Sequence, residues 1–116
     1  MKRIIVSLFF LSSLLFSQSF KKDTQYYCLN SYNVKQGEKI VVEKEVALNN
    51  PLIFTIKKEK LITSRNIEFD FRMQKGGMSS YSNEELMLLL TPGNMLGLVP
   101  KKARGQLQLF FKCEEK

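Results

Sequence analysis

The sequence predicts a small all-β domain: an antiparallel barrel or sandwich of about seven or eight short strands, closed by one disulfide. Three observations lead to this prediction. Apolar side chains recur with a period of two, as they do on half-buried antiparallel strands. Turn-forming residues separate these runs at spacings of roughly 8–12 residues. Two cysteines stand near the two ends of the region that we expect to fold.

The first 19 residues are typical of a secretory signal peptide. Lys2 and Arg3 give a positive start, a mostly apolar run of 13 residues follows over 4–16, and Ser17 and Ser19 supply small residues before a cut after position 19. A membrane-spanning helix needs roughly 20 apolar residues, more than this run provides. We therefore expect residues 1–19 to be cleaved, and residues 20–116 to form a single β domain.

Cleavage would leave 97 residues with 16 basic and 11 acidic side chains, a net charge of +5. No cysteine stands at the cut, since Cys28 lies nine residues beyond Ser19, so a lipid anchor is not expected. We expect a soluble periplasmic or secreted protein of the bacterial envelope, without a transmembrane span after cleavage.

The two cysteines, Cys28 and Cys113, allow only one intramolecular pairing. Export would place both in an oxidising compartment, where disulfides persist. A redox-active dithiol usually has its cysteines close in sequence, as in C-x-x-C, and these two are far apart. We therefore expect a structural disulfide that joins the first strand to the last.

Two segments give the clearest strands. Residues 67–72 place Ile67, Phe69 and Phe71 on one face, opposite three charged side chains. Residues 106–113 do the same with Leu107, Leu109, Phe111 and Cys113, so the second cysteine should face the core. At the other end of the domain, Tyr26 and Cys28 share one face of a strand over 25–30.

Shorter strands are expected at 39–48, 52–57, 61–63 and 95–99, where Gly97 indicates a bulge or a close approach to the backbone. Turn-forming or charged residues separate them at 49–51, 57–60, 64–66, 74–77 and 91–94. Segment 83–90 stays open. Ser82 and Glu85 match a helix capping box, but the five apolar residues 86–90 also suit a buried strand. The neighbouring strands favour the strand.

The composition excludes several kinds of chemistry. Without histidine there is no Ser-His-Asp triad, no Cys-His pair and no imidazole metal ligand. We expect no catalytic residues, no metal site, no cofactor and no enzyme activity. Nucleic acid is not an expected partner, because the basic charge is modest, no recognition motif is present and export separates the protein from DNA and RNA.

Three basic clusters are candidate binding features: Lys21 with Lys22, residues 57–60, and Lys101, Lys102 and Arg104. Two clusters brought together would attract anions such as lipid headgroups, lipopolysaccharide or anionic glycans. The third cluster is the preferred candidate, since it follows Pro100 in an expected exposed loop. The alternative is that these lysines only solubilise loops and protect sheet edges.

Segment 76–81 is the second candidate. Gly76 and Gly77 permit positive φ angles, and Ser79, Ser80 and Tyr81 add hydroxyl groups. A recognition loop is one interpretation, and a hairpin turn is the alternative. The first hypothesis for function is a non-enzymatic binding or accessory module, whose partner is another envelope protein or an anionic surface component.

A family resemblance suggests a second hypothesis. With Tyr26-Tyr27-Cys28 on the first strand, Gly77 to Tyr81 mid-chain and Cys113 ending the last strand, the chain resembles the periplasmic inhibitors of C-type lysozyme. The resemblance implies a small disulfide-closed antiparallel barrel whose serine-bearing loop enters an enzyme cleft. That family carries an S-G-x-x-Y loop; here Gly76-Gly77 stands where Ser-Gly would be, and Ser79 and Ser80 fall inside the motif. The alternative function is therefore a lysozyme-type inhibitor acting through Gly76–Tyr81.

Overall fold

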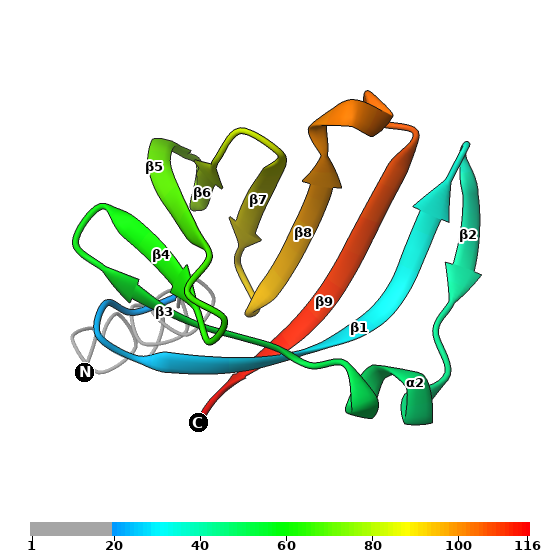
Figure 1. Ribbon diagram of the computed structural model, residues 1–116, viewed down its shortest axis with the longest axis horizontal. Helices are drawn as coiled ribbons and strands as arrows, with labels where there is room; N and C mark the ends of the chain where they lie inside the picture. Colours follow the sequence, from blue (N-terminus) through cyan, green and yellow to red (C-terminus); the bar gives the residue numbers. More distant parts are fainter. Residues whose placement is uncertain (1–19) are drawn as a thin grey trace, which may run out of the picture.

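The computed structural model describes residues 20–116, which form one antiparallel sheet of nine strands (Figure 1). The predicted signal peptide, residues 1–19, lies outside the described residues. The strands are β1 (Gln25–Lys35), β2 (Glu38–Val41), β3 (Leu52–Lys57), β4 (Lys60–Thr63), β5 (Glu68–Lys75), β6 (Met78–Ser82), β7 (Leu86–Thr91), β8 (Met95–Pro100) and β9 (Leu107–Glu115). Two short helical segments join them, α2 (Lys44–Asn49) and the 3-10 helix η1 (Lys101–Ala103).

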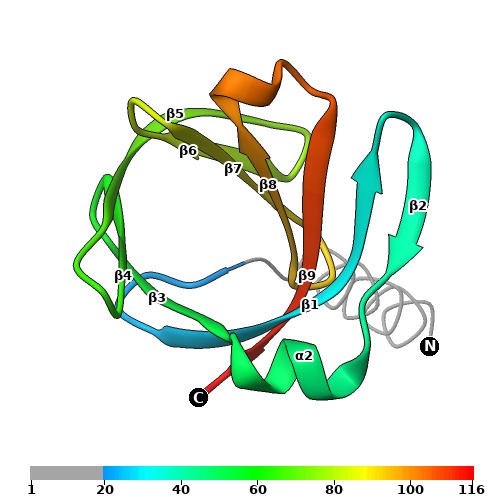
Figure 2. The same ribbon diagram turned by 45° about the vertical axis from the view of Figure 1, so that its right-hand side comes forward.

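Eight of the strands close into a barrel. From β3 to β9, each strand pairs with the next one along the chain, and β1 joins β3 to β9. Figure 2 shows this ring, with β2 and α2 outside it. β2 is an extra strand beside the second half of β1, with Tyr32 opposite Val41. The predicted fold class, a small all-β antiparallel barrel with one disulfide, is confirmed.

The disulfide joins the two strands that close the barrel. Cys28 of β1 and Cys113 of β9 stand directly opposite each other and are bonded. Both are buried, Cys28 completely and Cys113 with 6% of its surface exposed. The prediction that the disulfide connects the first and last strands is confirmed.

Alternate residues of the barrel strands point inward and form the core. Phe54 and Ile56 of β3 are buried, as the period of two predicts for 52–57, and Phe111 and Cys113 are buried on β9. Leu52 and Leu109 pack against this core while partly exposed. The core consists of Tyr26, Cys28, Phe54, Ile56, Leu61, Phe69, Tyr81, Leu88, Leu90, Leu96, Phe111 and Cys113.

The open question at 83–90 is decided in favour of a strand. β7 pairs on both sides, with Leu88 opposite Tyr81 of β6 and Leu98 of β8. Asn83 makes the preceding turn, because its Oδ1 accepts hydrogen bonds from the N–H groups of Glu85 and Leu86 at 2.9 and 2.8 Å. The short helix considered there is therefore wrong, since pairing on both sides satisfies the backbone of this segment as a strand.

The predicted strand at 39–48 is partly wrong. The strand ends at Val41, and Lys44–Asn49 form the helix α2, which packs against β1. Glu, Lys, Ala and Leu are good helix formers, and a helix turns Ala47 inward while Val46 and Leu48 stay about half exposed. Pro51 limits any extension of the helix beyond Asn50. No helix among residues 20–116 is long and apolar enough to cross a membrane.

The predicted core face at 67–72 holds only for Phe69, which is buried. Ile67 is 43% exposed because it precedes β5. Phe71 faces the barrel opposite Tyr81 but lies near an open end, and it is 37% exposed. A bulge follows it, since the register shifts between Phe71 and Met73.

Gly97 marks a close approach, as predicted. A Cβ atom built on Gly97 would lie 3.5 Å from the ring of Phe110, which stands opposite it on β9. Tyr32 of β1, the strand on the other side of β9, stands opposite Phe110 and stacks with it, with the ring centroids 4.7 Å apart. An aromatic ring over a strand glycine covers exposed backbone, and here it pins the register of three strands on the outside of the barrel.

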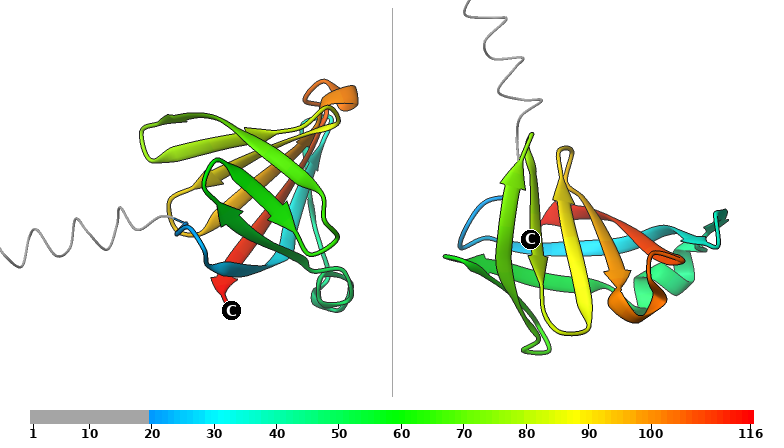
Figure 3. Two further views of the ribbon diagram at one scale, coloured as in Figure 1. Left: turned by 60° about the vertical axis from the view of Figure 1, so that its left-hand side comes forward. Right: turned by 90° about the horizontal axis from the view of Figure 1, so that it is seen from above.

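The connections alternate between the two ends of the barrel. The turns β3–β4, β5–β6 and β7–β8 share one end with residues 20–24, and we call this end the N-terminal rim. The turns β4–β5 and β6–β7 and the segment η1 lie at the other end. Figure 3 shows η1 on the far side of the barrel from the tips of the β5–β6 and β7–β8 hairpins.

Candidate functional site

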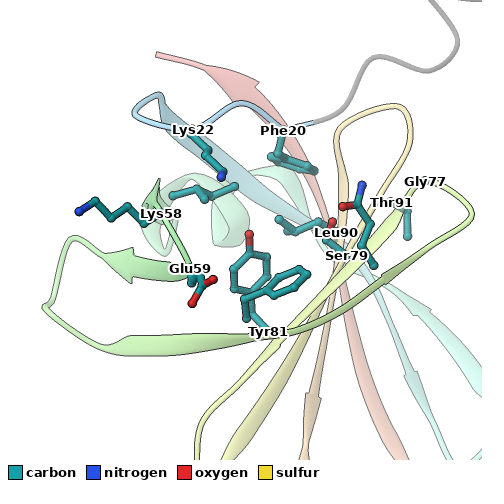
Figure 4. Close-up of a pocket in the computed structure, with 12 residues that line it drawn as sticks. Phe20, Lys22, Lys58, Glu59, Gly77, Ser79, Tyr81, Leu90 and Thr91 are labelled. Atoms are coloured by element: carbon teal, nitrogen blue, oxygen red, sulfur yellow. The ribbon is translucent and has the colours of Figure 1, made fainter.

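A cavity of about 390 Å³ opens at the N-terminal rim. Pockets for small ligands run from about 300 to 1,000 Å³, so this one suits a small ligand or one end of a larger one. Its lining joins apolar, aromatic and polar side chains from four strands, from two of the turns and from the segment that precedes β1 (Figure 4). The lining residues are Phe20, Lys22, Ile56, Lys58, Glu59, Phe71, Gln74, Gly77, Ser79, Tyr81, Leu90 and Thr91.

Aromatic rings form two walls of the cavity. On one side Phe20 packs on the core rings of Tyr26 and Phe54, with centroids 4.7 and 5.7 Å away. On the other side Phe71 of β5 meets Tyr81 of β6 edge to face at 5.5 Å. Strand register produces the second pair, because Phe71 and Tyr81 are directly opposite on the inner face. Ile56 and Leu90 add apolar surface between the two walls.

Tyr81 is the best-defined polar group of the site. Only 5% of the residue is exposed, and its hydroxyl points into the cavity (Figure 4). The other core tyrosine, Tyr26, accepts a hydrogen bond from the N–H of Lys21 at 2.7 Å, whereas no partner for Tyr81 Oη exists within residues 20–116. Burial raises the pKa of Tyr81 above its usual value, so the phenol stays protonated at neutral pH and can donate a hydrogen bond.

Two basic clusters converge on this rim. The N–H of Asp23 donates to the carbonyl of Ile56 at 2.7 Å, which holds the segment carrying Lys22 beside β3 and its turn. The ammonium of Lys22 points into the cavity, whereas that of Lys58 points away from it (Figure 4). In the described chain, Lys21 pairs with Glu115 and Lys60 with Glu68, and neither Lys22 nor Lys58 takes part in an ion pair.

One carboxylate, Glu59, also borders the cavity. It follows Lys58 in the β3–β4 turn, so the rim carries both signs of charge. With Lys22 directed inward and Lys58 directed outward, the charge presented at the cavity itself is nearly balanced. The inward ammonium of Lys22 can pair with one anionic group, but the cavity does not offer a cluster of several cations.

Segment 76–81 forms a hairpin tip and the first residues of β6, in agreement with the interpretation as a hairpin turn, while its role in recognition stays a prediction. Gly76 and Gly77 form its tip with φ angles of 58° and 83°. The next residues belong to β6 and alternate in direction: Ser79 and Tyr81 line the cavity, whereas Ser80 lies opposite Met73 and Leu89 on the outer face. The three hydroxyls are thus not presented together, because a strand sends successive side chains to opposite faces.

The preferred basic cluster lies elsewhere. Lys101 and Lys102 are exposed on η1, and Arg104 follows in a left-handed conformation with a φ angle of 51°. This segment connects β8 to β9 at the end opposite to the cavity (Figure 3). The structure therefore brings together residues 21–22 and 57–60, but not Lys101, Lys102 and Arg104.

Phe20 and Phe71 are site residues that the sequence did not single out. The alternation at 67–72 assigned Phe71 to the core, and nothing local marked Phe20 as more than the residue after the predicted cut. Within residues 20–116 no group of three or more His, Cys, Asp or Glu residues is placed to hold a metal ion.

Comparisons with known proteins identify no relative of this chain, so a functional proposal has to rest on the geometry of the site. The chain matches no protein-family model, no curated protein and no solved structure.

Proposed function

We propose that this chain is an exported, non-enzymatic binding module of the bacterial envelope, which takes up an anionic envelope component at the N-terminal rim. One observation carries the proposal: two basic segments distant in sequence converge on a cavity into which a tyrosine hydroxyl without a partner among residues 20–116 is directed. Lys22 and Lys58 come from these segments, and Tyr81 supplies the hydroxyl.

The electrostatics supports weak, salt-dependent binding. Cations at the mouth of an apolar opening raise the local concentration of anions, because the low-dielectric walls focus their field. Lys22 and Lys58 are exposed, so each contributes little on its own and salt screens it over about 10 Å at 0.1 M. Lipid headgroups, lipopolysaccharide phosphates and anionic glycans are repetitive surfaces, on which such weak contacts can add up.

Export is supported by the leader-like residues 1–19 and by the use of both cysteines in one disulfide. Structural disulfides are rare in the cytosol of most organisms and common in secreted and periplasmic proteins. A direct test is the intact mass of the product after expression with its own leader. A processed chain beginning at Phe20, with no free thiol, is expected; a full-length chain with two free thiols would contradict export.

The binding test uses matched charge changes at the two ends of the barrel. Lys22→Gln/Lys58→Gln and Lys101→Gln/Lys102→Gln each remove two charges, so net charge alone cannot explain a difference between them. Binding to phosphatidylglycerol vesicles should weaken several-fold for the first variant and change little for the second, and neutral phosphatidylcholine vesicles should not bind. Equal losses in both variants would show that the rim has no special role.

The lysozyme-type inhibitor remains a second candidate, and one observation favours it. The tip of the β5–β6 hairpin stands on the same rim, and Met78 beside its two glycines is 40% exposed, so the tip could enter a cleft. An inhibitor acting this way would block a muramidase, and replacing Met78 with Asp would abolish the block. Full muramidase activity in a molar excess of the protein would exclude it.

A further inference from the structure

We propose that the ligand of the rim cavity is a single anionic head joined directly to a short apolar body, such as a medium-chain carboxylate or an alkyl phosphate. The head would accept a hydrogen bond from Tyr81 and face the ammonium of Lys22. The apolar body would lie between Phe20 and Phe71. This inference rests on the proposed function and narrows its ligand from an anionic component to an anionic amphiphile.

The need for an acceptor comes from Tyr81. Tyr81 as a residue is 95% buried, but its hydroxyl oxygen reaches the cavity and is not one of the buried, unpaired polar atoms of the described residues. A hydroxyl in an open cavity can pair with water, and a ligand that displaces this water has to offer an equivalent partner. This hydroxyl points into an open cavity, and no described residue pairs with it. A protonated phenol donates its hydrogen, so the complementary ligand atom is an acceptor, and an anionic oxygen is the strongest acceptor.

The charges around the cavity favour one negative group over several. Only Lys22 directs its ammonium inward, Lys58 directs its own outward, and Glu59 adds a negative charge to the lining. A polyanion would meet repulsion from Glu59 without gaining a second inward cation. A single anionic head placed between Lys22 and Tyr81 has both favourable contacts.

The apolar body of the ligand is inferred from the side chains that line the cavity and from the filled core beneath it. Phe20, Phe71, Ile56 and Leu90 give the cavity more apolar surface than a bare ion would use. Leu61 and Leu88 are fully buried in the core, so the barrel is filled rather than hollow. The cavity of about 390 Å³ is thus a shallow mouth, and it limits the body to a short chain or one ring.

Titration of the protein with straight-chain carboxylates of increasing length tests the inference. The probes are butanoate, hexanoate, octanoate and decanoate, with octyl phosphate as the second head, and octyl glucoside, acetate and inorganic phosphate as the controls. The protein is the purified product of the full chain expressed with its leader. Calorimetry should show affinity rising about fourfold per added methylene until the cavity is full, because each buried methylene adds a fixed increment. Octyl glucoside, acetate and inorganic phosphate should bind far more weakly.

Two variants locate the head. Tyr81→Phe keeps the ring and the core packing, so it should fold normally and bind octanoate about tenfold more weakly or worse, through the loss of a charge-assisted hydrogen bond. Tyr27→Phe, on the outer face of β1, is the matched control and should bind like the parent protein. Lys22→Gln should weaken octanoate binding several-fold and make it insensitive to salt.

The outcomes separate this inference from the proposed function. If vesicles of phosphatidylglycerol bind through the rim but octanoate and octyl phosphate neither bind nor compete, the amphiphile inference is overturned and the proposed function stands. If octyl glucoside binds as well as octanoate, or Tyr81→Phe binds as well as the parent, the assigned head contacts are wrong. If neither vesicles nor amphiphiles bind, both proposals fail.

Discussion

Reduction of the Cys28–Cys113 disulfide is expected to remove a large part of the stability of this domain. The bond joins residues 85 positions apart, so it closes almost the whole described chain into one loop. In the chain-entropy treatment, opening a loop of this length costs about 4.6 kcal/mol at 25 °C. The total free energy of unfolding of a small domain is about 5–15 kcal/mol, so the reduced protein should be marginal.

Urea denaturation followed by far-ultraviolet circular dichroism measures this loss. The oxidised protein is compared with the same protein kept in dithiothreitol, which leaves both sulfur atoms in place and creates no cavity. The Cys28→Ala/Cys113→Ala variant is the second comparison. Its free energy of unfolding should be somewhat lower than that of the reduced protein, because both cysteines are buried and replacing them with alanine also removes packing contacts.

Refolding kinetics gives an independent check on the same reasoning. The pairing of β1 with β9 connects the two ends of the described chain, and in the reduced protein it requires closing a loop of about 80 residues. The oxidised protein begins with those strands tethered, so it should refold faster, while the unfolding rates should differ less. A stability loss below about 1 kcal/mol with unchanged refolding would refute the tether argument.

Three further predictions concern the core, the outer face and the site. Leu88→Ala should lower the free energy of unfolding by about 2–5 kcal/mol in urea denaturation, whereas Leu48→Ala, at a position 45% exposed, should change it by less than about 0.5 kcal/mol; similar losses would contradict the observed burial. Gly97→Ala should fold with little loss, since its Cβ would meet the Phe110 ring at an ordinary 3.5 Å, but Gly97→Leu should displace that ring and lower the melting temperature. Because burial raises the pKa of Tyr81, the unfolded state loses this proton first as the pH rises above 10.0, so stability should fall there, and it should fall less in Tyr81→Phe; equal alkaline losses would show that Tyr81 titrates normally.

Much of the barrel could be predicted from local patterns. Alternation identified the inner faces of 52–57 and 106–113, turn residues marked the hairpins, and the cysteine count fixed the disulfide. These features depend on neighbouring residues or on simple counting, so a single sequence carries them. Alternation also placed Phe69 and Phe71 on one face, but it could not show that Phe71 lies near the mouth, where the wall of the barrel ends.

The site could not be predicted, because it depends on which strands are neighbours. Tyr81 gains its role from standing opposite Phe71, and Lys22 gains its role from the bond between Asp23 and the carbonyl of Ile56. The first contact joins two strands of one hairpin in which a bulge shifts the register, and the second joins residues 33 positions apart (56 − 23). The alternation of apolar side chains encodes neither of them. From the sequence alone, two basic clusters were expected to form a common patch only on the condition that the fold brought them together.

The misassigned segment 39–48 also affects which basic clusters are expected to lie together. In a meander, each strand reverses direction, so successive turns alternate between the two ends of the barrel. A barrel strand at 39–48 would have separated residues 21–22 from turn 57–60, placing them at opposite ends. In the structure β2 and α2 lie outside the ring and β3 pairs directly with β1, so the two clusters share the N-terminal rim. The strand β6 was expected to be a loop, but it belongs to the barrel, so the barrel still has eight strands. The predicted number of strands was therefore correct, although one of the predicted strands was not. For a closed barrel, identifying the strands that belong to the ring therefore matters more for locating a site than the number of strands does.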